Sequence, residues 1–356
     1  MRYASIMAGG SGTRLWPMST PAEPKQLLRF INGRSLLSTS AGRLMGLVNP
    51  ENIYVCTSNA YADKVLADLP FLSPERLLGE PMGRDTLNAV GFSAAIIHKV
   101  DPEATLAILT ADHLISPVPE FQRTLQQAFE LAEKMPDYLF TFGITPTFAA
   151  TGFGYLECGE VIADHAKRVV AFREKPESAV AENYLRSGRH LWNSGMFVWK
   201  TATILDQIRI HQPEAYAGLQ KIADRYGTAD FASTVAKVYP TLPKISIDYA
   251  IMEKAPKVAT IPMSVDWLDV GSWSSYAQTL TPDADGNRTN QADLLAIDAH
   301  GIVAVSDSRH LVAVVGISDL VVVNSGNVTM ICPRDQAEKV KLLAQAAQKA
   351  YPDGYK

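Results

Sequence analysis

About the first 280 residues alternate short apolar runs with segments of helical periodicity. Segment 121–132 carries apolar residues at i, i+4, i+7, i+8 and i+11, which places them on one face of a helix. Strands that alternate with helices predict an α/β fold with a mostly parallel, doubly wound sheet. The apolar runs that predict strands are 4–7, 53–57, 105–110 and 138–143.

The pattern changes after Pro282. An acidic connector at 283–287 precedes short apolar runs spaced roughly ten residues apart, which predict a compact all-β unit. A helical pattern then occupies 334–350. We therefore predict two domains, 1–282 and 283–356. The runs that predict the β unit are 294–297, 302–305, 311–315, 320–323 and 328–331.

Composition excludes several classes of protein. The 356 residues are 47% hydrophobic and 20% charged, which is typical of globular domains. The net charge is −4 and no run rich in Lys and Arg occurs, so a long nucleic acid is not an expected partner. No apolar segment reaches the length of a signal peptide or a membrane span, so we expect a cytoplasmic protein. Three widely spaced cysteines predict buried, reduced thiols.

A glycine-rich segment, residues 8–17, follows the first predicted strand. Glycines at 9, 10 and 12 leave the backbone N–H groups free to surround anionic oxygens, and Arg14 and Lys25 add positive charge. No Lys follows Gly12, which excludes a Walker A loop, and the glycine spacing excludes the dinucleotide fingerprint. Glycines alone would equally fit a ligand-free turn. Together with the two cations they predict a triphosphate site that comprises Gly9, Gly10, Ser11, Gly12, Thr13, Arg14 and Lys25.

Two isolated carboxylates, Asp112 and Asp269, fit a magnesium site. Mg²⁺ prefers oxygen ligands and usually takes one or two carboxylates together with phosphate and water. Either aspartate alone would more simply be a helix cap or a turn residue. Asp112 follows a predicted strand, as the glycine segment does, and the carboxyl ends of parallel strands share one sheet edge. The joint occurrence of the two aspartates and the glycine-rich segment therefore predicts that Asp112 and Asp269 hold Mg²⁺.

A third set of residues fits recognition of a sugar phosphate. Glu174 could accept hydrogen bonds from sugar hydroxyls while Lys175 contacts the phosphate, although a solvated turn is the simpler explanation of this pair alone. Glu157 and Asn193 offer further hydroxyl-binding groups, and Gly154 would let the backbone approach the ligand.

These motifs together resemble those of the mannose-1-phosphate guanylyltransferases, nearly from end to end. The resemblance implies the nucleotide-diphospho-sugar transferase fold, which is Rossmann-like, with a small left-handed β-helical C-terminal part. It implies that GTP and mannose 1-phosphate react to give GDP-mannose and pyrophosphate. The chain resembles the short form, without the isomerase domain of bifunctional relatives. The residues that carry the resemblance are 8–17, 24–26, 80–81, 83–84, 111–113, 152–155, 174–176, 192–197, 246–250 and 269–273.

The resemblance also implies roles for single residues. Arg14 and Lys25 would stabilise the departing pyrophosphate, and Lys175 would hold the sugar phosphate. No Ser, Cys or His nucleophile is needed, because the sugar-phosphate oxygen attacks the α-phosphorus in line. Asp112, Lys175 and Asp269 complete the expected catalytic set.

Guanine presents two adjacent donors, N1–H and the N2 amino group, which a buried carboxylate could accept. Glu80 is the candidate reader of the base, and Arg84 and Thr86 are expected to bind the nucleotide. The family pattern Gly-Arg-Asn-Thr-Ala-Pro differs here, because Asp85, Leu87 and Asn88 occupy three of its positions.

Two alternatives remain open. The same fold could use another base or another sugar 1-phosphate, or the chain could be a regulatory subunit that binds a GDP-sugar without turnover. The presence of both metal carboxylates and of the leaving-group cations favours an enzyme over a sensor. The apolar runs of the C-terminal unit could bury a partner surface, so we expect a homodimer, although the same runs would also serve to cover the main domain.

Overall fold

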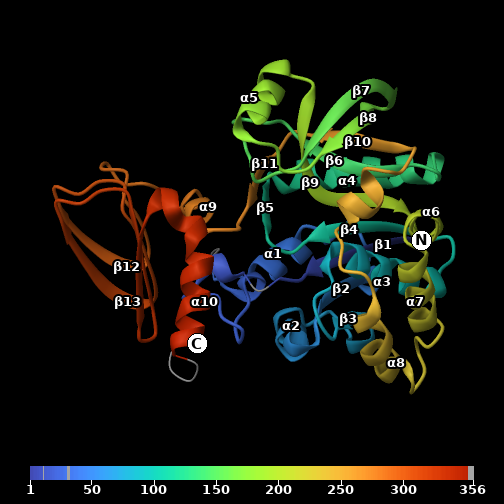
Figure 1. Ribbon diagram of the computed structural model, residues 1–356, viewed down its shortest axis with the longest axis horizontal. Coiled ribbons are helices and arrows are strands. Elements are labelled where there is room, and N and C mark those ends of the chain that lie inside the picture. Colours follow the sequence, from blue (N-terminus) through green and yellow to red (C-terminus); the bar gives the residue numbers. More distant parts are fainter. Residues whose placement is uncertain (11, 30–32, 352–356) are drawn as a thin grey trace. The chain divides into compact units, whose positions relative to one another are not determined.

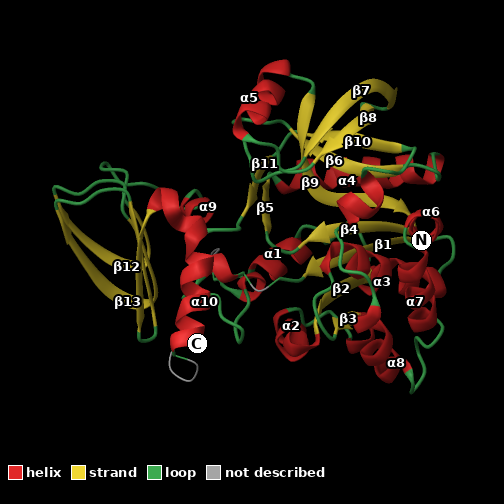
Figure 2. Cartoon of the chain, in the orientation of Figure 1, coloured by secondary structure: helices red, strands yellow, loops and turns green. Residues whose placement is uncertain are grey.

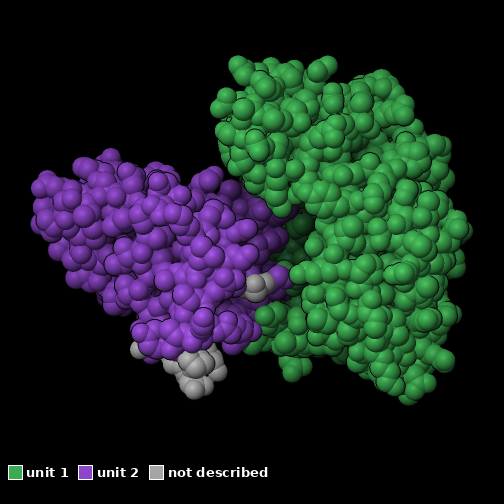
Figure 3. All heavy atoms as spheres, viewed as in Figure 1, with its two compact units in different colours: residues 1–9, 38–111, 115–267 green, residues 10–37, 112–114, 268–356 purple. Residues whose placement is uncertain are grey.

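The computed structural model describes residues 1–10, 12–29 and 33–351, and their contacts form two compact units (Figure 3). Unit 1 comprises residues 1–9, 38–111 and 115–267, and unit 2 comprises the described residues of 10–37, 112–114 and 268–356. Each unit combines segments that are separated along the chain, since the units follow contacts in space and not chain order. The boundary predicted at residue 282 therefore stays a prediction.

Unit 1 contains a nine-stranded sheet with the order β3-β2-β1-β4-β9-β6-β10-β8-β7 (Figure 1). Strands β3, β2, β1 and β4 are parallel, as are β6 and β10, whereas β7, β8 and β9 pair antiparallel with their neighbours. The predicted α/β class and all four predicted strands are confirmed, in a sheet that is mixed. The strands are β1 (Arg2–Ala8), β2 (Ile53–Ser58), β3 (Leu77–Glu80), β4 (Thr105–Thr110), β6 (Leu139–Ile144), β7 (Tyr155–Ala163), β8 (Ala166–Arg173), β9 (His190–Lys200) and β10 (Val258–Met263).

Helices cover both faces of this sheet (Figure 2). Tyr3 belongs to the core that the strands form with α3, α6, α7 and α8, whereas its neighbour Arg2 reaches Gln126 and Glu133 of α4, so these helices lie on opposite faces. The apolar face predicted within 121–132 is buried, which confirms that helix. The helices are α2 (Ala62–Asp68), α3 (Asp85–Val100), α4 (Val118–Lys134), α5 (Ser178–Ser187), α6 (Thr201–His211), α7 (Pro213–Ala223) and α8 (Phe231–Val238). Short 3-10 turns lie at η3 (Pro50–Asn52), η4 (Asn59–Tyr61), η5 (Pro74–Arg76) and η6 (Tyr239–Thr241), and a π-helix at η7 (Asp248–Met252).

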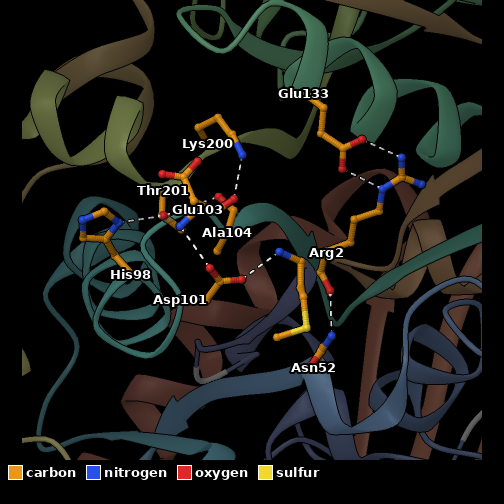
Figure 4. Close-up of polar contacts among 10 residues, drawn as sticks. Arg2, Asn52, His98, Asp101, Glu103, Ala104, Glu133, Lys200 and Thr201 are labelled. Atoms are coloured by element: carbon orange, nitrogen blue, oxygen red, sulfur yellow. Dashed lines mark hydrogen bonds and ion pairs between the residues drawn. The ribbon is translucent and has the colours of Figure 1, made fainter.

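Polar contacts fix the amino ends of the central strands (Figure 4). The amino terminus lies 2.7 Å from Asp101, just before β4, and the guanidinium of Arg2 donates to both carboxylate oxygens of Glu133 at 2.8 and 2.7 Å. Lys200, at the end of β9, donates to the carbonyl oxygen of Glu103 at 2.6 Å. These contacts join β1, β4 and β9 at the sheet edge opposite to the carboxyl ends of β1 and β4, from which the glycine-rich segment and Asp112 emerge.

Unit 2 contains the predicted β-rich C-terminal part. Its four strands lie in the order β12-β13-β14-β15, parallel from β12 to β14 and antiparallel at β15, and they enclose an apolar core. Parallel neighbours in chain order are typical of a β-helix. The strands are β12 (Arg288–Ile297), β13 (Val303–Val315), β14 (Leu320–Ser325) and β15 (Val328–Pro333). A short α9 (Trp273–Ala277) precedes them, and α1 (Leu36–Gly42) contributes residues to both units.

Three local predictions need correction. Runs 302–305 and 311–315 fall almost entirely within the single strand β13, which pairs with β12 on both sides of a register shift between Asn290 and Ala292. The helix predicted over 334–350 begins as the 3-10 helix η8 (Arg334–Lys339) and becomes α-helical only at α10 (Val340–Ala350). Of the three free cysteines, Cys56 is buried as predicted, whereas Cys158 and Cys332 are only half-buried. No helix within the described ranges is both long and apolar enough to cross a membrane.

Candidate active site

The glycine-rich segment leaves β1 at its carboxyl end and turns sharply. Gly10 and Gly12 have φ angles of +97° and +60°, in the region that favours glycine. A Cβ atom at Gly12 would lie 2.5 Å from Cβ of Lys25 and 2.8 Å from Oγ of Ser19, so only glycine lets Lys25 approach here. Thr13 begins the 3-10 helix η1 (Thr13–Leu15), and Lys25 begins η2 (Lys25–Leu27). Ser11 lies outside the described residues.

Unit 2 brings four predicted residues together, Arg14, Lys25, Asp112 and Asp269, which we call the Lys25 cluster. Nζ of Lys25 lies 2.5 Å from Oδ2 of Asp112. The strands that follow Asp112 and end at Asp269, β5 (His113–Ser116) and β11 (Asp266–Asp269), pair with each other. A Cβ atom on Gly271 would lie 3.4 Å from Oδ1 of Asp269 and 3.6 Å from Nη1 of Arg14. Two acids far apart in sequence thus surround one ammonium group.

The charges in the Lys25 cluster stabilise one another. Burial alone would raise the pKa of Asp112, but the ammonium of Lys25 and then His113 outweigh it and lower that pKa. Burial would likewise lower the pKa of Lys25, but Asp112 and Asp269 together raise it. The side chains of Lys25 and Asp112 are only 13% and 23% exposed, and both stay charged at neutral pH. His113 lies at the margin, with Nε2 3.9 Å from Oδ1 of Asp112.

The same cluster fits a divalent cation shared with a ligand. Oδ1 of Asp269 is buried and has no hydrogen-bond partner among the described residues. Those residues contain no group of three or more His, Cys, Asp or Glu side chains that could hold a metal by themselves. Two carboxylates, one with an unpartnered oxygen, match the few protein ligands that Mg²⁺ takes when phosphates supply the others.

One contact of Arg14 was missed by sequence reasoning. Nε of Arg14 lies 2.8 Å from Oε2 of Glu338, in η8. The two side chains are 48% and 66% exposed, so the pair is well solvated. No sequence signal links an acid near the C-terminus to a cation in the first glycine-rich segment, and only the folded unit reveals the pair.

Unit 1 places Glu80, the candidate base reader, at the end of β3 and beside Gly9. Glu80 is 7% exposed, and its Oε1 accepts a hydrogen bond of 2.6 Å from the hydroxyl of Tyr239. Oε2 faces Gly9, where a Cβ atom would lie 3.8 Å away. Burial raises the pKa of Glu80, and the hydrogen bond from Tyr239 opposes that rise.

Arg84 and Thr86 bond to the protein itself. The guanidinium of Arg84 donates to the carbonyl oxygen of Pro240, and the hydroxyl of Thr86 accepts a hydrogen bond of 2.9 Å from the backbone N–H of Ile247. Both side chains therefore join the start of α3 to the segment 240–247. Their expected contacts with a nucleotide stay a prediction.

A second cluster in unit 1 comprises Gly154, Glu174, Asn193 and Asp248, and we call it the Asn193 cluster. The amide of Asn193 is its centre: Oδ1 accepts from Oγ1 of Thr141 at 3.0 Å, and Nδ2 donates to Oδ1 of Asp248 at 3.2 Å. A Cβ atom on Gly154 would lie 2.5 Å from Oε2 of Glu174, so glycine lets this carboxylate approach. The structure thus joins three of the five residues predicted for sugar recognition and adds Asp248.

Asp248 is a candidate site residue that the sequence prediction omitted. It begins the π-helix η7, an irregularity frequent at functional sites. Burial, and then the negative charge of Glu174, raise the pKa of Asp248 to about 7. The signal in the sequence was an acidic residue between Ile247 and the apolar residues that follow Tyr249. Burying a carboxyl group costs free energy unless it has polar partners, so an acid in an apolar stretch indicates a special role.

Lys175 and Glu157 differ in their relation to this cluster. Nζ of Lys175 lies 3.1 Å from Oε1 of Glu174. The backbone of Lys175 has a φ of +45°, which is unusual for a residue other than glycine. Glu157 pairs with His190, and strand alternation places both on the face opposite to Asn193. The structure therefore does not bring Glu157 into the Asn193 cluster, and its role in sugar binding stays a prediction.

Comparison with known proteins agrees with this arrangement. Residues 3–285 match the family model described as nucleotidyl transferase, and residues 293–345 match a MannoseP isomerase/GMP-like beta-helix domain. A putative mannose-1-phosphate guanylyltransferase of Vibrio cholerae is 34% identical over 96% of this chain and 73% of its own length. The guanylyltransferase RfbM of Salmonella typhimurium is 33% identical over 99% of this chain and 73% of its own. The chain belongs to the mannose-1-phosphate guanylyltransferase family.

A solved structure supports membership in this family. The protein from Thermus thermophilus described as a mannose-1-phosphate geranyltransferase superposes with a TM-score of 0.87 at 33% identity. The alignment covers 98% of this chain and 99% of that one, so the β-rich C-terminal part is shared as well. The nucleotidyltransferase fold and the β-helical part predicted by resemblance are confirmed.

Two departures from the family pattern now have a structural explanation. Asp85 has a φ of +65°, a conformation that Asn and Asp adopt more readily than other side chains, and Oδ1 accepts a hydrogen bond of 2.8 Å from the backbone N–H of Thr86. Asn88 is fully buried, and its amide donates to the carbonyl oxygens of Arg84 and Pro243 at 2.9 and 2.5 Å. Both residues stabilise the backbone of this turn through their own side chains.

Proposed function

We propose that this chain joins GTP and α-D-mannose 1-phosphate to give GDP-mannose and pyrophosphate. The observation that carries the proposal is the Lys25 cluster, in which two cations and two carboxylates adjoin a glycine-rich turn. This combination suits a triphosphate and a divalent cation together, and the relatives bear the name of this activity.

The reaction needs positioning and charge more than covalent chemistry. An oxygen of the sugar phosphate attacks the α-phosphorus and forms the new P–O bond. The bond from that phosphorus to the bridging oxygen breaks, and its electron pair leaves with pyrophosphate. Lys25 and Arg14 would neutralise the charge that develops on this leaving group, and the raised pKa of Lys25 keeps its ammonium protonated.

Asp112 and Asp269 would hold Mg²⁺ in this proposal. The positive charge of an ion held there would lower the repulsion between two anionic substrates. Asp112 also orients Lys25 through their contact, so its carboxylate would serve both cations. The unpartnered Oδ1 of Asp269 supports the assignment.

The two groups of unit 1 would recognise the base and the sugar. Glu80 beside Gly9 would accept the N1–H and N2 donors of guanine. Lys175 would contact the sugar phosphate, and Glu174 and Asn193 the hydroxyls. Because Asn193 already bonds to Thr141 and Asp248, much of its effect would be to orient Asp248.

Pyrophosphate release from a grid of nucleoside triphosphates and sugar 1-phosphates tests the proposal. We expect the highest rate with GTP and mannose 1-phosphate and no release without Mg²⁺. A higher rate with another pair of substrates would show that the chain uses a different base or a different sugar 1-phosphate. Tight binding of GDP-mannose without release under any condition would instead identify a regulatory subunit.

We also propose a cytoplasmic homodimer that associates through β12 and β13. Large apolar side chains on these strands are more than half exposed, as a partner surface requires, and β12 is the edge of its sheet. Sedimentation at micromolar concentration should give twice the mass of one chain, and a monomer there would contradict the proposal. The side chains are Leu295, Ile297, Leu311 and Val315.

A further inference from the structure

Tyr239 is a fully buried tyrosine whose hydroxyl group meets a carboxylate. It lies in η6, the 3-10 turn after α8, and its ring packs 5.7 Å from that of Phe92. Its hydroxyl donates to Oε1 of Glu80 at 2.6 Å. A short hydrogen bond to an ionised acceptor is among the stronger polar contacts in proteins.

This contact leaves one side of the Glu80 carboxylate available. The hydroxyl of Tyr239 contacts Oε1, whereas Oε2 points toward Gly9. Gly9 directly follows β1 and is the last residue of the first segment of unit 1. A carboxylate can accept at several lone pairs, so Glu80 retains acceptor capacity for two further donors. Its orientation, however, depends on the tyrosine hydroxyl that holds it.

We propose that Tyr239 is a positioning residue for recognition of guanine, because its hydroxyl fixes the carboxylate of Glu80 in the orientation that accepts from the base. The inference rests on the proposed function, in which Glu80 reads the base. Tyr239 acts only through Glu80 and contacts no reacting atom.

The segment that carries Tyr239 is itself held by the turn before α3. Arg84 donates to the carbonyl oxygen of Pro240, and the buried amide of Asn88 reaches the carbonyl oxygen of Pro243. Arg84, together with Asn88, which differs from the family pattern, thus helps to fix the segment that carries Tyr239. Their effect on base preference would pass through Tyr239.

Electrostatics agree with this geometry. Burial is the main reason that the pKa of Glu80 is raised, and the tyrosine hydrogen bond lowers it toward the ordinary range. Burial is the main reason that the pKa of Tyr239 is raised, and Cys56 and then Glu80 add to the rise, so its hydroxyl remains a donor throughout the physiological range. Tyr239 therefore favours the ionised, accepting form of Glu80.

The test compares Tyr239→Phe with the wild type, using GTP and inosine triphosphate, which lacks the N2 amino group. The ratio of kcat/KM for GTP to that for inosine triphosphate should fall by about tenfold in the variant, since the carboxylate loses its fixed orientation. The acidic limb of the GTP profile should also move to higher pH, because Glu80 loses a donor that stabilises its charge. Tyr226→Phe is the matched control, because its hydroxyl donates to the backbone carbonyl oxygen of Glu75 at 2.9 Å and not to a side-chain carboxylate.

Failure of the inference and failure of the proposed function give different results. A wild type that uses GTP, with an unchanged nucleotide ratio and pH profile in Tyr239→Phe, overturns the role of Tyr239 alone. A wild type that releases no pyrophosphate from GTP and any sugar 1-phosphate overturns the proposed function. If Tyr239→Phe does not fold, as judged by its thermal transition, Glu80→Gln decides the matter: undiminished discrimination between the nucleotides in that variant also overturns the inference.

Discussion

Asp112 and Asp248 are both poorly exposed aspartates in candidate sites, yet their surroundings have opposite effects. Asp112 has a lysine ammonium 2.5 Å away, and its pKa is lowered despite burial. Asp248 has an amide donor at 3.2 Å and Glu174 as a charged neighbour, and burial with that negative charge raises its pKa to about 7. The same side chain is therefore a permanent anion in one cluster and a titrating acid in the other.

This difference suits the two chemical tasks. A permanent carboxylate can hold a divalent cation, since metal ligands must be deprotonated. A carboxyl group that is half protonated near neutral pH can donate as well as accept, which suits sugar hydroxyls and places less negative charge near an anionic substrate. The comparison therefore predicts that changes at the two aspartates will differ in kind as well as in size.

The largest effect is expected from Asp112→Asn. The variant loses a metal ligand and leaves Lys25, only 13% exposed, with a weaker partner. The value of kcat should fall by roughly 10³-fold, because charge neutralisation at the phosphates is the main source of catalysis. Pyrophosphate release at saturating Mg²⁺ measures this loss.

Asp137→Asn is a suitable control for that variant. Asp137 also pairs with a lysine, Lys257, but both side chains are about half exposed. Its activity should match that of the wild type. A rate for Asp112→Asn within about threefold of the wild type would remove Asp112 from the metal site, and the contrast with Asp248 would then have no functional meaning.

A smaller, pH-dependent effect is expected from Asp248→Asn. In the wild type, Asp248 gains its negative charge as the pH rises through about 7, so the KM for mannose 1-phosphate should rise relative to the variant, by about fivefold between pH 6 and 8. Asparagine carries no charge, and comparing the two proteins at each pH cancels the titration of the substrate. Equal pH profiles would show that Asp248 does not face the sugar phosphate.

The same substitution predicts a change in stability. Since the folded-state pKa of Asp248 is raised above its unfolded value, its contribution to stability is complete below about pH 4 and is lost as the pH rises through about 7. The free energy of unfolding of the wild type should therefore fall relative to that of Asp248→Asn across this window, by at most about 1.4 kcal/mol per pH unit. Urea unfolding at several pH values measures the slope, which a fully ionised Asp248 would not produce.

The comparison also shows what the sequence could predict. Local apolar patterns were enough to place the glycine-rich segment and Asp112 at the ends of two strands. The structure shows that these strands, β1 and β4, pair in parallel with Met7 opposite Thr110, so both ends lie at the same side of the sheet. The face of the sheet on which a side chain lies was harder to predict. Glu157 lies on the face opposite to Asn193, and a shift of one residue in the start of β7, which the apolar pattern did not determine, would reverse this.

Side chains that act through tertiary contacts were not predictable in this way. Tyr239 has the pattern of an ordinary core residue, and only its partner Glu80 distinguishes it. Asp248 depends on Glu174 and Asn193, which come from other elements of unit 1. Local sequence determines where a strand or helix ends, whereas these pairings depend on how whole elements pack.

The smallest effect is expected from Glu338→Gln, which removes the carboxylate that pairs with Arg14 of the Lys25 cluster. Glu338 occupies the guanidinium of Arg14 at 2.8 Å and would compete with a triphosphate for it. Both side chains are well solvated, and exposed pairs contribute at most about 1 kcal/mol, so the KM for GTP should fall by less than about fivefold. The difference should shrink further at high salt, because screening weakens the pair in the wild type as well. Glu120→Gln, which breaks the pair with Arg123 on α4, should change no kinetic constant. A rise in the KM for GTP would instead mean that Glu338 orients Arg14 toward the nucleotide, so that the C-terminal part of unit 2 contributes to substrate binding.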